Sequence, residues 1–157
     1  MAATIDAGIE PAERVLVITR ILDAPRQLVF SAWTDPAHLA HWLGPRGFAA
    51  SNVRLDVRPG GGWRACLRPE DGGRALWMGG TYREVVAPER LVFTFAWDDE
   101  EGEPGHETLM RLDFADAGRG TRMTMRQAVF QTVEDRDGHS LGWTSSFERL
   151  DEHLRNC

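Results

Sequence analysis

The sequence predicts an α+β domain in which one strand, two short helices, six further strands and one long helix follow one another. Three observations predict it. Apolar and polar residues alternate with a period of two from Phe48 to Phe130, which is typical of strands with one buried face. Short turns separate these strands, so consecutive strands should pair antiparallel. Large apolar residues near the end of the chain then recur with helical spacing.

The first strand is predicted over Glu13–Ile21, where β-branched and apolar residues lie between charged ends. Asp23 is expected to cap the helix that follows, because a carboxylate can accept hydrogen bonds from the N–H groups of a first helical turn. This helix should end at Thr34, since Pro36 disfavours helical geometry in the residue before it. A second short helix is predicted from about Pro36 to Leu43.

The strands after Phe48 should each have one buried and one solvated face. In the first of them Val53, Leu55 and Val57 alternate with charged residues, and after a glycine-rich turn Trp63, Ala65 and Leu67 do the same. Four further strands are predicted, over Arg74–Val86, Leu91–Trp97, Glu107–Phe114 and Thr121–Phe130. The acidic run Asp98–Glu103 between two of them is expected to be a solvated hairpin loop.

The last segment predicts a long amphipathic helix. Its large apolar residues follow the spacing i, i+4, i+7, i+11: Trp143, Phe147, Leu150 and Leu154. Thr132 is the expected N-cap. Gly138 and Gly142 fall inside this helix, and each costs about 1 kcal/mol relative to alanine. Some feature of the molecule should therefore require a small residue at these two positions.

Length and composition indicate one domain without a membrane span. Residues 1–12 lack the basic start and apolar stretch of a secretion signal and are predicted to be a flexible lead-in, and residues 13–157 are predicted to form a single domain. The longest apolar runs have four residues, as in Val15–Ile18, far fewer than the roughly 20 that span a bilayer. Only Cys66 and Cys157 are present, which favours a cytoplasmic location.

The charge of the chain excludes several functions. A net charge of −6 has the wrong sign for a nucleic-acid-binding protein. All 18 basic residues are arginines, so the chain has no lysine for a Schiff base or for a phosphate-binding loop of the nucleotidase type. The sequence leaves the oligomeric state open, a homodimer included.

Several short motifs, in this order, resemble the family named after the activator of heat-shock protein 90 ATPase, within the SRPBCC or START-like superfamily. They cover nearly the whole chain, from about Ile18 to Leu154. The motifs are Asp23-Ala24-Pro25, Val29-Phe30, Ala32-Trp33-Thr34-Asp35-Pro36, His41-Trp42, Gly47-Phe48, Gly80 to Leu91, Gly120-Thr121, Gly142-Trp143, Leu150 and His153-Leu154.

The resemblance implies a helix-grip fold of the START or Bet v type. In this fold a curved antiparallel sheet of about seven strands wraps around a long C-terminal helix, with two short helices after the first strand. Such a sheet cannot touch the helix everywhere, so a cavity is expected between them. Alternation places the following residues inward: Trp63, Met78, Tyr82, Phe93, Phe95, Met110, Leu112, Met123, Met125 and, from the helix, Trp143 and Phe147.

The leading hypothesis is a small cytoplasmic protein that binds an apolar or amphipathic small molecule in this cavity, without a catalytic residue, cofactor or metal. Tryptophan and methionine side chains suit a pocket that adapts to an apolar guest. The same side chains would equally suit an ordinary filled core. Gln127 stands where the family often has a histidine, and it is the expected polar group on the buried face, satisfied by the backbone.

Two other functions follow from the resemblance. Other START-like proteins are cyclases or dehydratases that use polar groups within the cavity, and here Tyr82, Glu84 and Gln127 would have to converge. Glu84 falls on the same side as Tyr82 if its strand is regular. Co-regulation of a chaperone ATPase is implied only by the family's name, and no effect on such an ATPase is expected, because the chain holds a single copy of the domain.

Two motifs favour ordinary structural roles. Gly138-His139-Ser140-Leu141-Gly142 matches the nucleophile elbow of serine hydrolases, but Asp151 and His153 diverge on one helix and cannot complete a triad with Ser140. His38 and His41 could share one helical face, a spacing that metals accept, although no third ligand is near in sequence. A partly solvated pair near the mouth of the cavity is expected instead.

Overall fold

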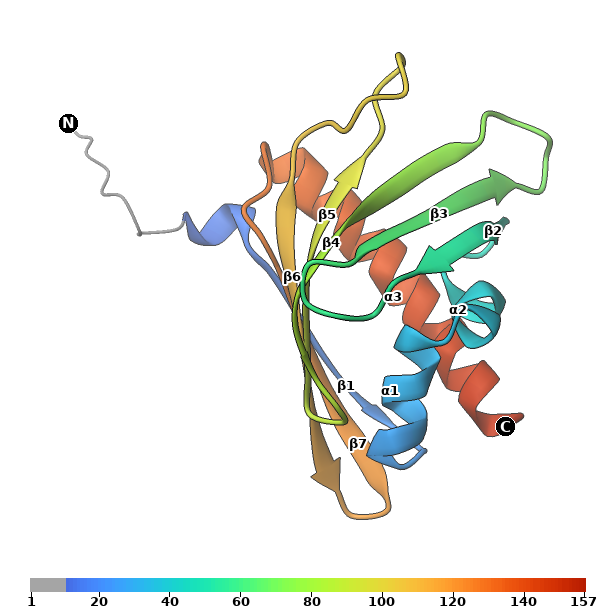
Figure 1. The fold of residues 1–157 in the computed structure, drawn as a ribbon, viewed down its shortest axis with the longest axis vertical. Helices are drawn as coiled ribbons and strands as arrows, with labels where there is room; N and C mark the ends of the chain where they lie inside the picture. The colour runs from blue at the N-terminus through green and yellow to red at the C-terminus, as the bar shows by residue number, and fades with distance from the viewer. Residues whose placement is uncertain (1–10) are drawn as a thin grey trace.

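The computed structural model describes residues 11–157, whose strands form one antiparallel sheet in the order β1-β7-β6-β5-β4-β3-β2 (Figure 1). The strands are β1 (Leu16–Leu22), β2 (Phe48–Leu55), β3 (Gly62–Pro69), β4 (Leu76–Val86), β5 (Arg90–Trp97), β6 (Thr108–Ala117) and β7 (Gly120–Ala128). The helices are the 3-10 turn η1 (Ala12–Arg14), α1 (Arg26–Thr34), α2 (Pro36–Trp42) and α3 (Val133–Arg155). The predicted fold class and order of elements are confirmed. Of the lead-in predicted over residues 1–12, residues 1–10 lie outside the described part of the chain.

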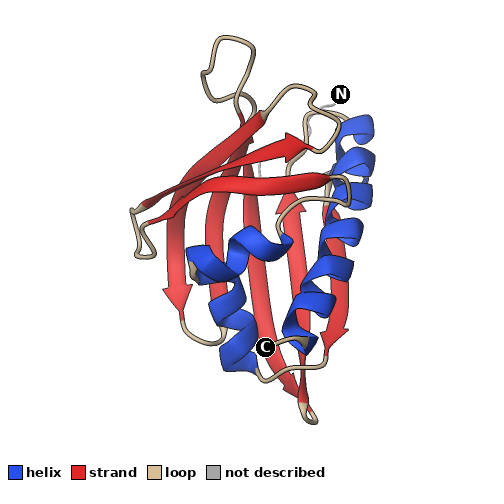
Figure 2. Ribbon diagram, turned by 90° about the vertical axis from the view of Figure 1, so that its right-hand side faces the viewer, coloured by secondary structure: helices blue, strands red, loops and turns tan. Residues whose placement is uncertain are grey.

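The sheet curves around α3, and all three α-helices lie on its concave side (Figure 2). The first strand pairs with the last, from Leu16 opposite Gln127 to Leu22 opposite Thr121. The β2 and β3 strands run transverse to the strands at the other end of the sheet and end beside the upper half of α3 in the view of Figure 2. This is the helix-grip fold that the resemblance implied.

Helix α3 begins as predicted. Thr132 is its N-cap, and the Oγ1 of Thr132 accepts a hydrogen bond of 3.0 Å from the N–H of Asp135. The helix continues without a break through Gly138 and Gly142, and its four large apolar residues, from Trp143 to Leu154, are all buried against the sheet. No helix within residues 11–157 combines the length and the hydropathy that crossing a bilayer requires.

The cap of α1 differs from the prediction. Pro25, and not Asp23, occupies the N-cap position, and no side chain caps this helix. The carbonyl of Pro25 accepts from the N–H groups of Leu28 and Val29, so the helix begins after Pro25 and Asp23 stands two residues before the N-cap. The side chain that does cap a helix in this region is Asp35, which accepts a bond of 2.9 Å from the N–H of Ala37 at the start of α2.

The residues predicted to face inward are all buried, each with at most 7% of its surface exposed. Glu84 was expected on the side of Tyr82 only if its strand is regular, and the strand is not regular here. Tyr82 lies opposite Phe93 and Glu84 lies opposite Val92, so β4 carries one extra residue at this point and the alternation shifts. Glu84 is therefore exposed and pairs with Arg90 at 3.3 Å on the convex side.

Candidate functional site

A cavity of about 320 Å³ lies between the N-terminal half of α3 and the strands β3 to β5. The loop that joins α2 to β2 closes one side of it. Most of the lining groups are apolar, and the complete set is Leu43, Gly44, Pro45, Phe48, Leu67, Leu76, Met78, Phe95, Trp97, Glu134, Asp135, Gly138, His139, Gly142, Trp143 and Ser146. The volume is at the lower end of the range of small-molecule sites, which is about 300–1,000 Å³.

Two glycines of α3 form the helical wall of the cavity. Gly138 and Gly142 are one helical turn apart and therefore lie on the same face. A Cβ atom added at either position would meet no heavy atom within 4 Å, so both positions face open space. This explains why small residues were expected at these two positions. Only backbone atoms of α3 border the cavity here, and a longer side chain would fill part of it.

His139 is a polar group of the cavity wall with both ring nitrogens engaged. The indole Nε1 of Trp97 donates a bond of 2.9 Å to its Nε2, and its Nδ1 lies 2.8 Å from the carbonyl of Asp135. Since Nε2 accepts, Nδ1 carries the proton and the imidazole is neutral. Burial against Phe95 and Phe130 lowers the pKa of His139 below the ordinary value of 6.5.

A chain of buried hydrogen bonds fixes the ring of Trp143, which also lines the cavity. Its Nε1 donates to the Oε1 of Gln127 at 2.9 Å, and the Nε2 of Gln127 donates to the Oγ1 of Thr108, also at 2.9 Å. Thr108 in turn donates to the carbonyl of Phe95. Gln127 is thus the buried polar residue that the sequence predicted, but its partners are side chains and not the backbone.

The loop from Leu43 to Phe48, which forms the lip of the cavity, is held by Arg149 of α3. One terminal guanidinium nitrogen of Arg149 donates to the carbonyls of Gly44 at 2.7 Å and Phe48 at 3.0 Å, and it also lies within 3.5 Å of the carbonyls of Leu43 and Pro45. The other terminal nitrogen donates to the carbonyl of His41, at the end of α2. A cation at the C-terminal end of a helix is stabilising, because the last carbonyls have no partner within the helix.

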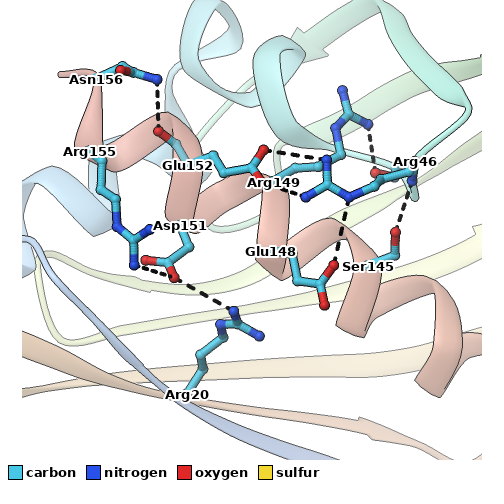
Figure 3. A network of polar contacts seen from close by, with 10 residues as sticks. Arg20, Arg46, Ser145, Glu148, Arg149, Asp151, Glu152, Arg155 and Asn156 are labelled. Carbon is cyan, nitrogen blue, oxygen red and sulfur yellow. Dashed lines mark hydrogen bonds and ion pairs between the residues drawn. The ribbon is translucent and has the colours of Figure 1, made fainter.

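A second arginine, Arg46, ties the same loop to α3 from outside (Figure 3). Its backbone N–H donates to the Oγ of Ser145 at 2.9 Å, and its guanidinium pairs with Glu148 and Glu152. These ion pairs are half exposed and contribute little to stability one by one. Together with Arg149 they hold the lip of the cavity in one position against α3.

The rim of the cavity is acidic. Glu134 and Asp135, in the first turn of α3, are exposed and are the only ionised side chains among the described residues that line it. No arginine takes part in the lining. The cavity therefore offers an apolar interior and a negative edge.

The predicted site residues fall into three groups. Met78, Phe95 and Trp143 line the cavity, and Trp63, Tyr82 and Phe93 line a smaller inner void that Phe95 and Trp143 share. This void measures about 20 Å³, room for about one water molecule. The remaining predicted site residues border neither space and pack in the core: Met110, Met123, Met125, Gln127 and Phe147. That any of them binds a ligand stays a prediction.

Sequence reasoning missed the residues of the lip, from Leu43 to Phe48, and the role of His139. The contacts of the lip with α3 join segments about a hundred residues apart, and His139 bonds to Trp97 of β5, 42 residues earlier; no local sequence pattern predicts such contacts. The pair of helical glycines was the one available signal, because their cost within a helix requires an explanation.

The structure supports the rejection of the serine-hydrolase motif. Ser140 lies inside the continuous helix α3 and not on a turn between a strand and a helix. His153 lies about 20 Å further along the helix axis. Residues 99–103 of the acidic run form an exposed loop, as predicted, whereas the Asp98 side chain is largely buried and is bound to Arg64 at 2.8 Å.

The placement predicted for the histidine pair was wrong in one respect. His38 and His41 do not lie at the mouth of the cavity and are not among the residues that line it. They face the C-terminal end of α3, where His38 Nδ1 lies 2.9 Å from the Nε2 of His153. The cavity is at the other end of that helix.

Comparisons with known proteins agree with this fold. A crystal structure of a Chromobacterium violaceum protein matches with 27% identity and a TM-score of 0.79, over 88% of this chain and 95% of the other. A Nitrosomonas europaea protein matches with 26% identity and a TM-score of 0.78, over 93% and 97%. The crystal structure of the AHSA1 protein from Silicibacter pomeroyi has a TM-score of 0.82 at 24% identity, over 90% and 97%, and shows the fold alone.

No curated protein matches the sequence. The family model described as "Activator of Hsp90 ATPase homolog 1-like protein" matches residues 23–155, which include α1, α2, α3 and the strands from β2 to β7. The chain therefore belongs to the Activator of Hsp90 ATPase homolog 1-like family.

Proposed function

We propose that this protein binds one small apolar or amphipathic molecule in the cavity between α3 and the sheet. The proposal rests on the wall formed by Gly138 and Gly142. No side chain extends from α3 at these two positions, and a cavity of about 320 Å³ borders them. An apolar cavity of about 150 Å³ in another protein holds one benzene molecule. A guest of about two fused or linked rings, or an aliphatic chain of similar volume, suits this space.

The rim indicates which polar end such a guest carries. Glu134 and Asp135 would repel a carboxylate or a phosphate, and no arginine of the lining would offset that repulsion. We therefore infer an uncharged or cationic head group next to an apolar body. His139 offers no free nitrogen for the guest while its bonds to Trp97 and Asp135 persist.

The alternative enzymatic function has less support. It required Tyr82, Glu84 and Gln127 to converge, but Glu84 lies on the convex side of the sheet. Gln127 is occupied by Trp143 and Thr108. Burial raises the pKa of Tyr82, so its phenol stays protonated in the physiological range and is no base.

We also propose a cytoplasmic location. Both cysteines are unpaired in the described residues, with Cys66 buried and Cys157 exposed, and a reducing compartment keeps thiols in this state.

Fluorescence titration with Nile red, an uncharged apolar dye, tests the binding proposal. The wild-type protein should bind it saturably, and Gly142→Leu should weaken binding at least about tenfold because the new side chain fills the cavity. Thr144→Leu is the matched control, since it adds the same side chain to an exposed position of the same helix. Equal affinity of Gly142→Leu and wild type, or no saturable binding to wild type, would contradict the proposal.

A further inference from the structure

Three side chains with metal-binding atoms meet where α2 crosses the C-terminal end of α3. They are His38 of α2, His153 of α3 and Cys157, which follows α3. The Nδ1 of His38 lies 2.9 Å from the Nε2 of His153, and that nitrogen lies 3.8 Å from the Sγ of Cys157. All three ligand atoms lie within 4.8 Å of one another. The sequence does not predict that these three residues meet, because His38 belongs to α2 and His153 to α3.

These distances are close to those of a tetrahedral zinc site. Zinc binds nitrogen at about 2.0–2.1 Å and thiolate sulfur at about 2.3 Å, so two nitrogens bound to one ion are about 3.3 Å apart, and a nitrogen and a sulfur about 3.6 Å. The observed separations of 2.9 Å and 3.8 Å bracket these values. Small rotations of side chains would bring the three atoms to the required spacing, and Cys157 is exposed and free to make them.

The surroundings orient the imidazole of His153. The ring of His41 stacks on that of His153, with centroids 5.1 Å apart and planes 13° from parallel, which limits how the ring can turn.

We propose that His38, His153 and Cys157 bind one Zn²⁺ ion through Nδ1, Nε2 and the thiolate, with a water molecule in the fourth position. Nitrogen and thiolate ligands select zinc over Mg²⁺ and Ca²⁺, which take oxygen ligands. Binding releases the thiol proton of Cys157 to solvent, which breaks the hydrogen bond from this thiol to the carbonyl of His153, and it replaces the hydrogen bond between the two imidazoles. The ion would join α2 to α3 at the end of the helix opposite the cavity, so this site does not depend on the proposed ligand binding.

Isothermal titration of the untagged, metal-free full chain with zinc chloride under a phosphine reductant tests the proposal. One zinc per chain should bind with a dissociation constant of about 1 µM or less. His38→Asn and Cys157→Ser should each weaken binding at least about tenfold, since each removes a ligand. His106→Asn is the matched control, because His106 is an exposed histidine outside the cluster. Wild-type binding weaker than about 100 µM, or wild-type affinity in Cys157→Ser, would overturn the proposal.

Cobalt provides an independent readout. Co²⁺ bound to the wild-type protein should show the absorption of a thiolate-to-cobalt charge transfer, and His106→Asn should keep it. Cys157→Ser should lose this band even though Cys66 is still present, because Cys66 is buried in the sheet. A band that persists in Cys157→Ser would place the metal elsewhere and would refute the assignment.

Discussion

The indole of Trp143 donates a hydrogen bond of 2.9 Å to the Oε1 of Gln127, so the buried face of β7 holds the aromatic wall of the cavity in place. Gln127 is fully buried, and a buried amide without partners would be costly. Its second bond, to Thr108, orients the amide so that the oxygen faces the indole. The buried amide of Gln127 thus fixes the position of the Trp143 ring.

Gln127→Leu is expected to lower the free energy of unfolding by about 1–3 kcal/mol, because it leaves the N–H of Trp143 buried without an acceptor. Urea unfolding followed by tryptophan fluorescence measures the change. Gln131→Leu is the control: Gln131 is exposed, so its replacement should stay within about 0.5 kcal/mol of wild type. Equal stability of the two variants would show that the Trp143 bond contributes little.

Gly142→Ala is expected to raise the free energy of unfolding by about 1 kcal/mol, because alanine is the better helix former. Its Cβ would enter open space, so no clash offsets the gain. Gly80→Ala is the contrast, since a Cβ at Gly80 would lie 1.9 Å from the carbonyl oxygen of Thr94 and should destabilise β4. Chemical unfolding of the two variants should give changes of opposite sign, and a loss of stability in Gly142→Ala would contradict the open wall.

Arg149→Met is expected to cost about 1.5–3 kcal/mol, because the loop carbonyls lose a charged donor. Amide hydrogen exchange should increase most in residues 43–48, the lip of the cavity. Arg155→Met serves as the control, since the Arg155 side chain is largely exposed and Asp151 keeps its other partner, Arg20. Unchanged exchange in the loop would mean that other contacts hold it.

The neutral state of His139 predicts a loss of stability in mild acid. The folded-state pKa lies below 6.5, so the unfolded chain binds the proton more readily. The free energy of unfolding should therefore fall as the pH drops below about 6.5 and should level off for this group once the pH is below the folded-state pKa. Above that window His139 contributes no pH dependence.

His139→Gln isolates this effect, because an amide can still accept from Trp97 and does not titrate. His153, whose pKa is also lowered, contributes in the same direction in both proteins. Unfolding curves between pH 7 and pH 5 should decline less steeply for the variant. Parallel curves would show that the unfolded state gains no more protons at His139 than the folded state does.

The order of strands and helices could be predicted because alternation and helical spacing are local properties of the chain. The Thr132 cap and the buried stripe of α3 followed from such patterns. The side of the sheet on which Glu84 lies depended on whether its strand is regular. One extra residue in β4 moves the side chains after it to the opposite face, and the sequence carries no clear sign of that bulge. The capping role of Asp23 failed because the helix begins after Pro25.

The cavity and the histidine cluster were harder to predict because their residues come together only in three dimensions. Arg149 reaches a loop about a hundred residues earlier, and His153 meets a histidine of α2. The aromatic and methionine residues could be assigned to the interior from alternation alone. Which of them border open space depends on the exact separation of α3 from the sheet, which the pattern of residues does not determine.

The pairing of β1 with β7 has a consequence for how the chain is made. During synthesis β1 is the first of the seven strands to leave the ribosome, its partner β7 is the last, and α3 follows β7. The nascent chain must carry an unmatched strand edge until β7 has emerged. A chain arrested before Gly120 should accordingly be cut readily by a protease, whereas the full-length chain should resist it.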